Sequence, residues 1–125
     1  MKLSEVKKLL KCKVLCGEEF IEREVFFAGA SDLLSDILAF SKPHCLQLTG
    51  LTTNQTIYTC KMALIKSVVF VRGKLPDESV IEMANKDGFV LLATDLPLYE
   101  CCGILYNAGL AGTVIEPIKQ KKNKK

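Results

Sequence analysis

The sequence predicts a single three-layer α/β domain around a mainly parallel sheet built from βα repeats. A strand–turn–helix pattern recurs from His44, Lys66 and Gly88, a spacing of 22 residues, which suits one strand and one helix per repeat. Strands that alternate with helices form parallel sheets with right-handed crossovers. Residues 67–71 are apolar without alternation, which indicates a strand covered on both faces. The chain of 125 residues has the length of one domain, which we expect to span residues 1–118.

The N-terminal segment predicts one helix and two strands before the repeats begin. Residues 4–11 form a short helix, for which Ser4 is the expected N-cap. Residues 12–16 alternate around Val14 and predict a short strand. Residues 22–28 are β-branched and aromatic and predict a second strand.

A second helix is expected at residues 31–40, where Ser31 begins it and Pro43 follows its end. Its core stripe at helical spacing consists of Leu33, Leu34, Ile37 and Leu38. The repeats then supply three strand–helix pairs, at residues 45–48 and 54–64, 67–71 and 77–86, and 89–93 and 97–108. Residues 114–118 could add a short edge strand, since Pro117 argues against a central one.

Candidate binding residues follow the predicted strands. In an open parallel sheet, ligands bind beyond the carboxyl ends of the strands, and the helix N-termini found there attract anions. The residues that we expect to bind a ligand are Ser31, Asp32, Thr49, Gly50, Thr52, Arg72, Gly73 and Thr94. Thr49 and Gly50 carry the strongest signal, because the polar run after them is longer than an N-cap needs. The guanidinium of Arg72 can bind a phosphate or a carboxylate.

Structural roles compete for the same residues. Serine, threonine and aspartate at helix starts are what N-capping requires, and glycine is what tight turns require. Arg72 would form an ion pair with an acidic neighbour. Asp32 and Asp36 could hold a magnesium ion, although such a pair more often lies on one face of a helix without a metal.

The sequence argues against catalysis. Gly73 and Lys74 are followed by Leu75 and lack the upstream glycine of a phosphate-binding loop. No Gly-x-Gly-x-x-Gly pattern follows a strand, and no motif places the one histidine, His44, beside a nucleophile. We therefore expect no catalytic residues, no metal and no cofactor.

Charge and cysteine content set the expected environment. The net charge is +3, but removing the five lysines of residues 119–125 leaves −2 for residues 1–118. The basic character thus belongs to a Lys-rich tail, which we expect to be disordered, so nucleic-acid and membrane partners are not expected. The six cysteines lack metal-ligand spacing. With a charged N-terminus and no long apolar run, a cytoplasmic protein with reduced thiols is expected.

Several ordered segments resemble the DRTGG domain family. They are residues 29–40, residues 46–51 with Thr49-Gly50, residues 68–74, and Ala93-Thr94. Of the pentapeptide that names the family, only Thr49 and Gly50 are present. The resemblance covers about residues 1–110 and implies a compact α/β domain related to the N-terminal domain of HPr kinase/phosphorylase. Similar domains accompany CBS modules in regulated pyrophosphatases and precede the catalytic part of some phosphotransacetylases, where they resemble non-catalytic sensor or assembly elements at dimer interfaces.

Two functions follow from the residues and the resemblance together. The first is a homodimeric regulatory domain that senses a small anionic ligand, for example a nucleotide, at the carboxyl ends of the strands. The second is a protein–protein interaction module without a small-molecule ligand. Exposure of Tyr58, Tyr99, Tyr106 or Phe26 in one apolar patch would favour the second.

Overall fold

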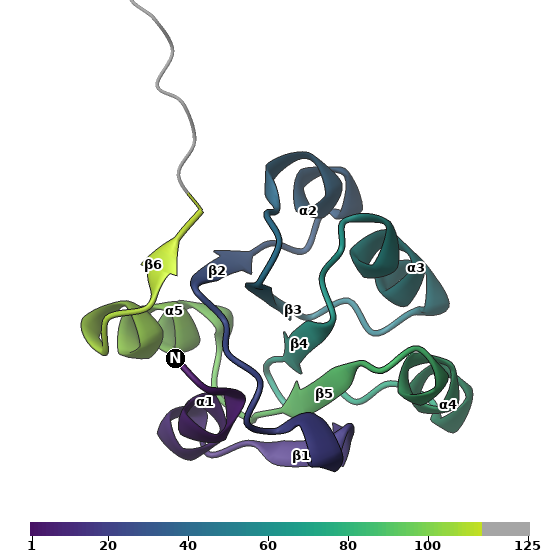
Figure 1. Cartoon of the computed structure of the whole chain (residues 1–125), viewed down its shortest axis with the longest axis horizontal. Helices are drawn as coiled ribbons and strands as arrows, with labels where there is room; N and C mark the ends of the chain where they lie inside the picture. The colour runs from purple at the N-terminus through teal and green to yellow at the C-terminus, as the bar shows by residue number, and fades with distance from the viewer. Residues whose placement is uncertain (114–125) are drawn as a thin grey trace, which may run out of the picture.

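The computed structural model describes residues 1–113, which form a six-stranded sheet between two layers of helices (Figure 1). This confirms the predicted three-layer α/β fold. The elements in chain order are α1 (Leu3–Leu10), β1 (Lys13–Cys16), η1 (Glu18–Phe20), β2 (Phe27–Ala30), α2 (Leu34–Phe40), β3 (Cys45–Thr49), α3 (Asn54–Met62), β4 (Ser67–Phe70), α4 (Glu78–Lys86), β5 (Val90–Ala93), α5 (Leu98–Asn107) and β6 (Ala111–Gly112).

The sheet has the strand order β1-β5-β4-β3-β2-β6. All neighbouring pairs are parallel except β1 with β5, which is antiparallel. Leu48 of β3 lies opposite Val69 of β4 and Ala30 of β2. The loops that leave β2, β3, β4 and β5 therefore meet at one rim of the sheet, which is the arrangement that the βα repeats predicted.

Both faces of the central strands are covered (Figure 1). Helices α1 and α5 pack on one face, where Leu46 and Leu48 meet Leu10 and Leu105. Helices α2, α3 and α4 pack on the other face. Every residue of β3, β4 and β5 is buried, which explains why these strands show no polar alternation.

The second strand begins at Phe27, so the expectation of a strand at residues 22–28 was wrong for its first five residues. The N-terminus lies beside this segment and forms backbone hydrogen bonds with it. Val25 N–H donates to the Met1 carbonyl at 2.8 Å, and Leu3 N–H donates to the Arg23 carbonyl at 2.9 Å. Glu22 lies in a turn, and Glu24 forms only an isolated antiparallel bridge with Lys2, so this segment does not join the sheet before Phe27.

Helices α1 and α2 begin at other residues than the sequence predicts. Helix α2 begins at Leu34, because the Ser31 hydroxyl accepts the Leu33 N–H at 3.0 Å and forms a turn before the helix. Of its expected stripe only Ile37 is buried, whereas Leu33 and Leu38 are exposed. Helix α1 begins at Leu3, and the Glu5 carboxylate accepts the Lys2 N–H at 3.0 Å, so Ser4 is not the N-cap.

The C-terminal expectations lie largely outside the described residues. The strand at residues 114–118, the domain boundary at residue 118 and the Lys-rich tail at residues 119–125 all lie beyond residue 113. Within the described part, β6 pairs in parallel with β2 and forms that edge of the sheet. The helices of residues 1–113 include none with both the length and the apolar character to cross a membrane.

Candidate functional site

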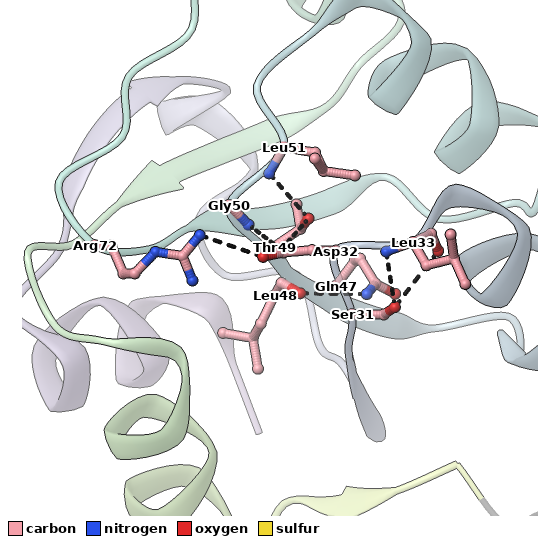
Figure 2. Close-up of polar contacts among 9 residues, drawn as sticks. All are labelled: Ser31, Asp32, Leu33, Gln47, Leu48, Thr49, Gly50, Leu51 and Arg72. Atoms are coloured by element: carbon pink, nitrogen blue, oxygen red, sulfur yellow. Dashed lines mark hydrogen bonds and ion pairs between the residues drawn. The ribbon is translucent and has the colours of Figure 1, made fainter.

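Three strand exits meet at the carboxylate of Asp32 (Figure 2). Asp32 follows β2, and its Oδ1 accepts hydrogen bonds from Gly50 N–H at 2.7 Å and from the Thr49 hydroxyl at 3.1 Å. Its Oδ2 pairs with Nη2 of Arg72, which follows β4, at 3.2 Å. Because β2, β3 and β4 are parallel neighbours, residues that are 17 to 40 positions apart in the sequence form one polar cluster.

The Arg72 guanidinium lies where a side chain on residue 50 would be. A Cβ built on Gly50 would come within 2.4 Å of Nη2, so the glycine is needed for this arrangement. Arg72 itself has a left-handed backbone with φ of 61°, which costs a non-glycine residue about 1 kcal/mol. Its N–H donates to the Leu96 carbonyl at 2.9 Å, which helps to hold this conformation.

The cluster is charged and partly open to solvent. The hydrogen bond from Gly50 N–H, the largest effect, together with bonds from Arg72 and Thr49, lowers the pKa of Asp32, although partial burial opposes the shift. Asp32 is therefore a carboxylate at neutral pH. The side chains of Arg72 and Asp32 are 41% and 40% exposed. A guanidinium has five N–H donors, so Arg72 can keep Asp32 and still bind a second anion.

The other predicted residues take different places. The half-buried Thr52 lies in the loop between Gly50 and α3, and Ser31 forms the turn before α2. Gly73 N–H donates to the Thr94 carbonyl at 3.0 Å. The Thr94 side chain does not join the cluster, because it is buried and its hydroxyl donates to the Leu10 carbonyl at 2.6 Å.

Sequence reasoning missed Gln47, which is buried within β3. Its Nε2 donates to the Leu48 carbonyl at 3.3 Å, and its side chain lines a cavity of about 190 Å³ together with Ser31, Asp36 and Ser41. A glutamine inside the run CLQLT is the signal that could have marked this polar cavity. Asp36 thus lies at a different cavity from the cluster around Asp32.

A larger groove of about 560 Å³ lies between α5 and the edge formed by β2 and β6. Ala30 and Leu48 line its sheet side, and Tyr99 and Tyr106 line its helix side. Tyr58 lies on α3 in the opposite helix layer. The tyrosines therefore do not form one patch, although two of them share the groove.

The cysteine thiols of the described residues are poorly reactive. Burial, the largest cause, raises the pKa of Cys12 and of Cys60 to about 12, so both are neutral thiols at physiological pH and weak nucleophiles. Within residues 1–113, no group of three or more histidine, cysteine, aspartate or glutamate side chains is placed to hold a metal ion.

Comparison with known proteins shows similarity in fold. No family model matches the chain, and no curated protein matches it. A similar solved structure is that of the CBS and DRTGG domains of the regulatory region of Clostridium perfringens pyrophosphatase, complexed with its activator diadenosine tetraphosphate. The TM-score is 0.67 at 13% identity, over 83% of this chain and 45% of that one. The chain therefore spans less than half of that structure, and the likeness agrees with the fold that the DRTGG resemblance implies.

Proposed function

We propose that this protein is a non-catalytic regulatory domain that senses a small anionic ligand at the carboxyl ends of its strands and works as a homodimer. The observation that carries the proposal is the Arg72 guanidinium, which is partly exposed at the rim. Its position depends on the left-handed backbone of Arg72 and on the room that Gly50 leaves because it has no Cβ. Strain of this kind is found where a functional site requires a particular geometry.

The surrounding backbone suits an anion. Helix α3 begins at Asn54, and no side chain of the described residues caps its N-terminus at Thr53. The first N–H groups of a helix and its dipole attract negative charge. A phosphate group would sit between Arg72 and this N-terminus, next to Thr49, Gly50 and Thr52. Ser31 and Asp32 limit the site on the β2 side, and Gly73 and Thr94 hold the loop that carries Arg72.

Nucleotides are the first ligands to test. The regulatory region of similar fold was solved with diadenosine tetraphosphate, which that protein binds as an activator. A chain of phosphates is the anion that a guanidinium and helix N–H groups recognise well. Dinucleoside polyphosphates therefore belong in the panel beside mononucleotides, acetyl phosphate, sugar phosphates and inorganic phosphate.

A thermal-shift panel with purified full-length protein tests the ligand site. At about 100 times its dissociation constant, a ligand should stabilise the fold by about 2.7 kcal/mol. The shift should disappear in Arg72→Ala and weaken in Thr49→Val. Lys74→Ala is the matched control, because it removes an exposed positive charge two residues away. No shift with any compound, or the same shift in Arg72→Ala, would contradict the proposal.

Gly50→Ala separates ligand binding from stability. The new Cβ would meet the end of the flexible Arg72 side chain, which can move aside at a cost below about 1 kcal/mol in unfolding free energy. We expect a nearly unchanged melting temperature without ligand and a lost ligand response. If the response survives, the guanidinium does not bind the ligand in the position described.

A protein-interaction module without a ligand is the second candidate. The exposed tyrosines Tyr99 and Tyr106 beside the groove favour it, since aromatic side chains are enriched in interfaces. A flat response to the whole panel, together with stable self-association or partner binding through this groove, would support this alternative over ligand sensing.

A further inference from the structure

The cavity between α2 and the strands β2 and β3 contains a buried amide whose hydrogen bonds are incomplete. Gln47 is 2% exposed. Its side chain forms one hydrogen bond with the described residues, from Nε2 to the Leu48 carbonyl at 3.3 Å (Figure 2). Within residues 1–113, its Oε1 and its second Nε2 hydrogen have no partner. Buried polar groups are normally hydrogen-bonded, so this amide has one acceptor and one donor left for a molecule in the cavity.

Gly29 of β2 leaves the room that the amide occupies. A Cβ built on Gly29 would lie 3.1 Å from Oε1 of Gln47, so a larger residue would push the amide aside. The backbone itself does not demand a glycine here, because Gly29 is not among the glycines with positive φ. A glycine inside a strand weakens it and often marks a place that a ligand approaches closely. Gly29 and Gln47 line the same cavity.

The other walls of the cavity have a mixed character. They supply the Asp36 carboxylate, the hydroxyls of Ser31 and Ser41, and the ring of Phe40. Asp36 takes part in none of the ion pairs of the described residues, and Phe40 is 48% exposed. The volume of about 190 Å³ equals that of about six water molecules in the liquid. The cavity therefore has room for one flat heterocycle with polar edges.

We infer that this cavity binds the base of an adenine nucleotide whose phosphates lie at Arg72. A glutamine amide presents a donor beside an acceptor, which is the complement of the adenine amino group and the ring nitrogen next to it. The Asp36 carboxylate can only accept hydrogen bonds, so it also favours an amino group. The Phe40 ring offers a face on which a base can stack. The inference rests on the proposed function and names the base that the site selects.

The cavity and the rim are close enough for one ligand. Gln47 and Thr49 are two residues apart on β3, so their side chains lie on the same face about 7 Å apart along the strand. The Thr49 hydroxyl donates to Asp32, which pairs with Arg72. On the β2 side, Ser31 lines the cavity and is followed directly by Asp32. A base joined to a phosphate chain therefore spans both places, whereas inorganic phosphate would use the rim alone.

Isothermal titration calorimetry of the full-length chain with ATP and ITP tests the inference. The two nucleotides carry the same sugar and phosphates, but ITP has a carbonyl where ATP has its amino group. We expect ATP to bind at least about tenfold more tightly. Gln47→Met, which is similar in size, should abolish this difference and leave the ITP affinity unchanged. Asp36→Ala should reduce the difference, and Glu82→Ala, which removes an exposed carboxylate from α4, should not.

Two results would overturn the inference. One is equal affinity of the wild type for ATP and ITP, and the other is a preference for ATP that both Gln47→Met and Asp36→Ala leave intact. Arg72→Ala separates the two proposals, because it should weaken ATP and ITP by the same factor.

Equal affinities that Arg72→Ala lowers leave the anion site standing without the base cavity. A preference for adenosine over inosine that Gln47→Met removes, without any effect of Arg72→Ala on the nucleotides, supports the cavity and not the anion site. No binding of any of these compounds would overturn both.

Discussion

Asp32 organises the rim of the sheet at the scale of single residues. Its two carboxylate oxygens join the loops after β2, β3 and β4 through Gly50, Thr49 and Arg72. Among the described residues, the ion pair of the Arg72 guanidinium is with Asp32. The same carboxylate that positions Arg72 also neutralises its charge, so an anion bound at the proposed site would use the N–H donors that Asp32 leaves free.

Acid should weaken the fold through Asp32. Because the folded pKa of Asp32 is lowered, its contribution to stability is present above the ordinary carboxyl pKa of about 3.9 and is lost as the pH falls through the lower folded value. We expect Asp32→Asn to reduce the unfolding free energy by about 1 kcal/mol at neutral pH, and by less under acid. Urea unfolding of both proteins at neutral and strongly acidic pH measures this. An equal difference at both would contradict it.

At this scale the sequence identified the rim but not its internal bonds. Thr49, Gly50 and Arg72 could be placed there, because strand exits of a parallel sheet share one edge. The contact of Arg72 with Gly50 could not be predicted, since it depends on a left-handed backbone at a residue type that rarely adopts one. Thr94 was placed at the right strand end, but its side chain turns towards α1, whose position no local pattern reveals.

At the scale of elements, the three βα repeats were predictable and the N-terminal segment was not. Strands β3, β4 and β5 pair with one another in chain order, and each is followed by its own helix, so local patterns are sufficient to predict them. Arg23 and Val25 instead form backbone hydrogen bonds with Leu3 and Met1, which are distant in sequence. Helix α2 keeps its helical spacing of leucines although only Ile37 is buried, because no element of the described residues covers its outer side.

Arg23 shows how the N-terminal segment is held to the sheet. Its Nη1 donates to the Lys66 carbonyl at 2.9 Å, and its Nη2 donates to the Gly88 carbonyl at 2.8 Å. These carbonyls lie one residue before β4 and two residues before β5, at the end of the sheet opposite the rim. One side chain therefore ties together two consecutive repeats.

We expect Arg23→Met to lower the unfolding free energy by about 2–3 kcal/mol, since the hydrogen bonds of a charged group to two carbonyls and to the Ser67 hydroxyl are lost. Arg23→Lys should lose less, because it keeps the charge but lacks the forked geometry. Arg72→Met, which removes an exposed ion pair, is the control and should cost below about 1 kcal/mol. Chemical denaturation measures all three. Equal losses at Arg23 and Arg72 would show that Arg23 is not a structural clamp.

Across the whole molecule, the share of buried residues falls from the central strands of the sheet to helix α2. Strands β3, β4 and β5 are fully buried and each has a neighbour on both sides. Helix α2 has one buried residue, whereas α3 in the same layer has four. Regions with few buried contacts open locally at low free energy, so stability should be unequal across the fold.

Hydrogen exchange should reveal this order. We expect the amides of β3, β4 and β5 to exchange last and only through global unfolding, and those of α2 to exchange first among the helices on its face. Exchange followed by mass spectrometry or NMR measures this, with α3 as the internal comparison. Protection of α2 equal to that of β4 would mean that another surface covers α2 in solution.

The strands beneath the groove are the strands that carry the rim. Ala30 and Leu48 line the groove. Asp32 lies two residues after Ala30, and Gly50 lies two residues after Leu48. If a ligand at the proposed site shifted β2 or β3, the groove would shift as well, and thermodynamic reciprocity would then link ligand binding to self-association through the groove. If the ligand favours the paired state, the dose needed for half-saturation will fall as the protein is concentrated, so the cell's own level of this protein would set its sensitivity.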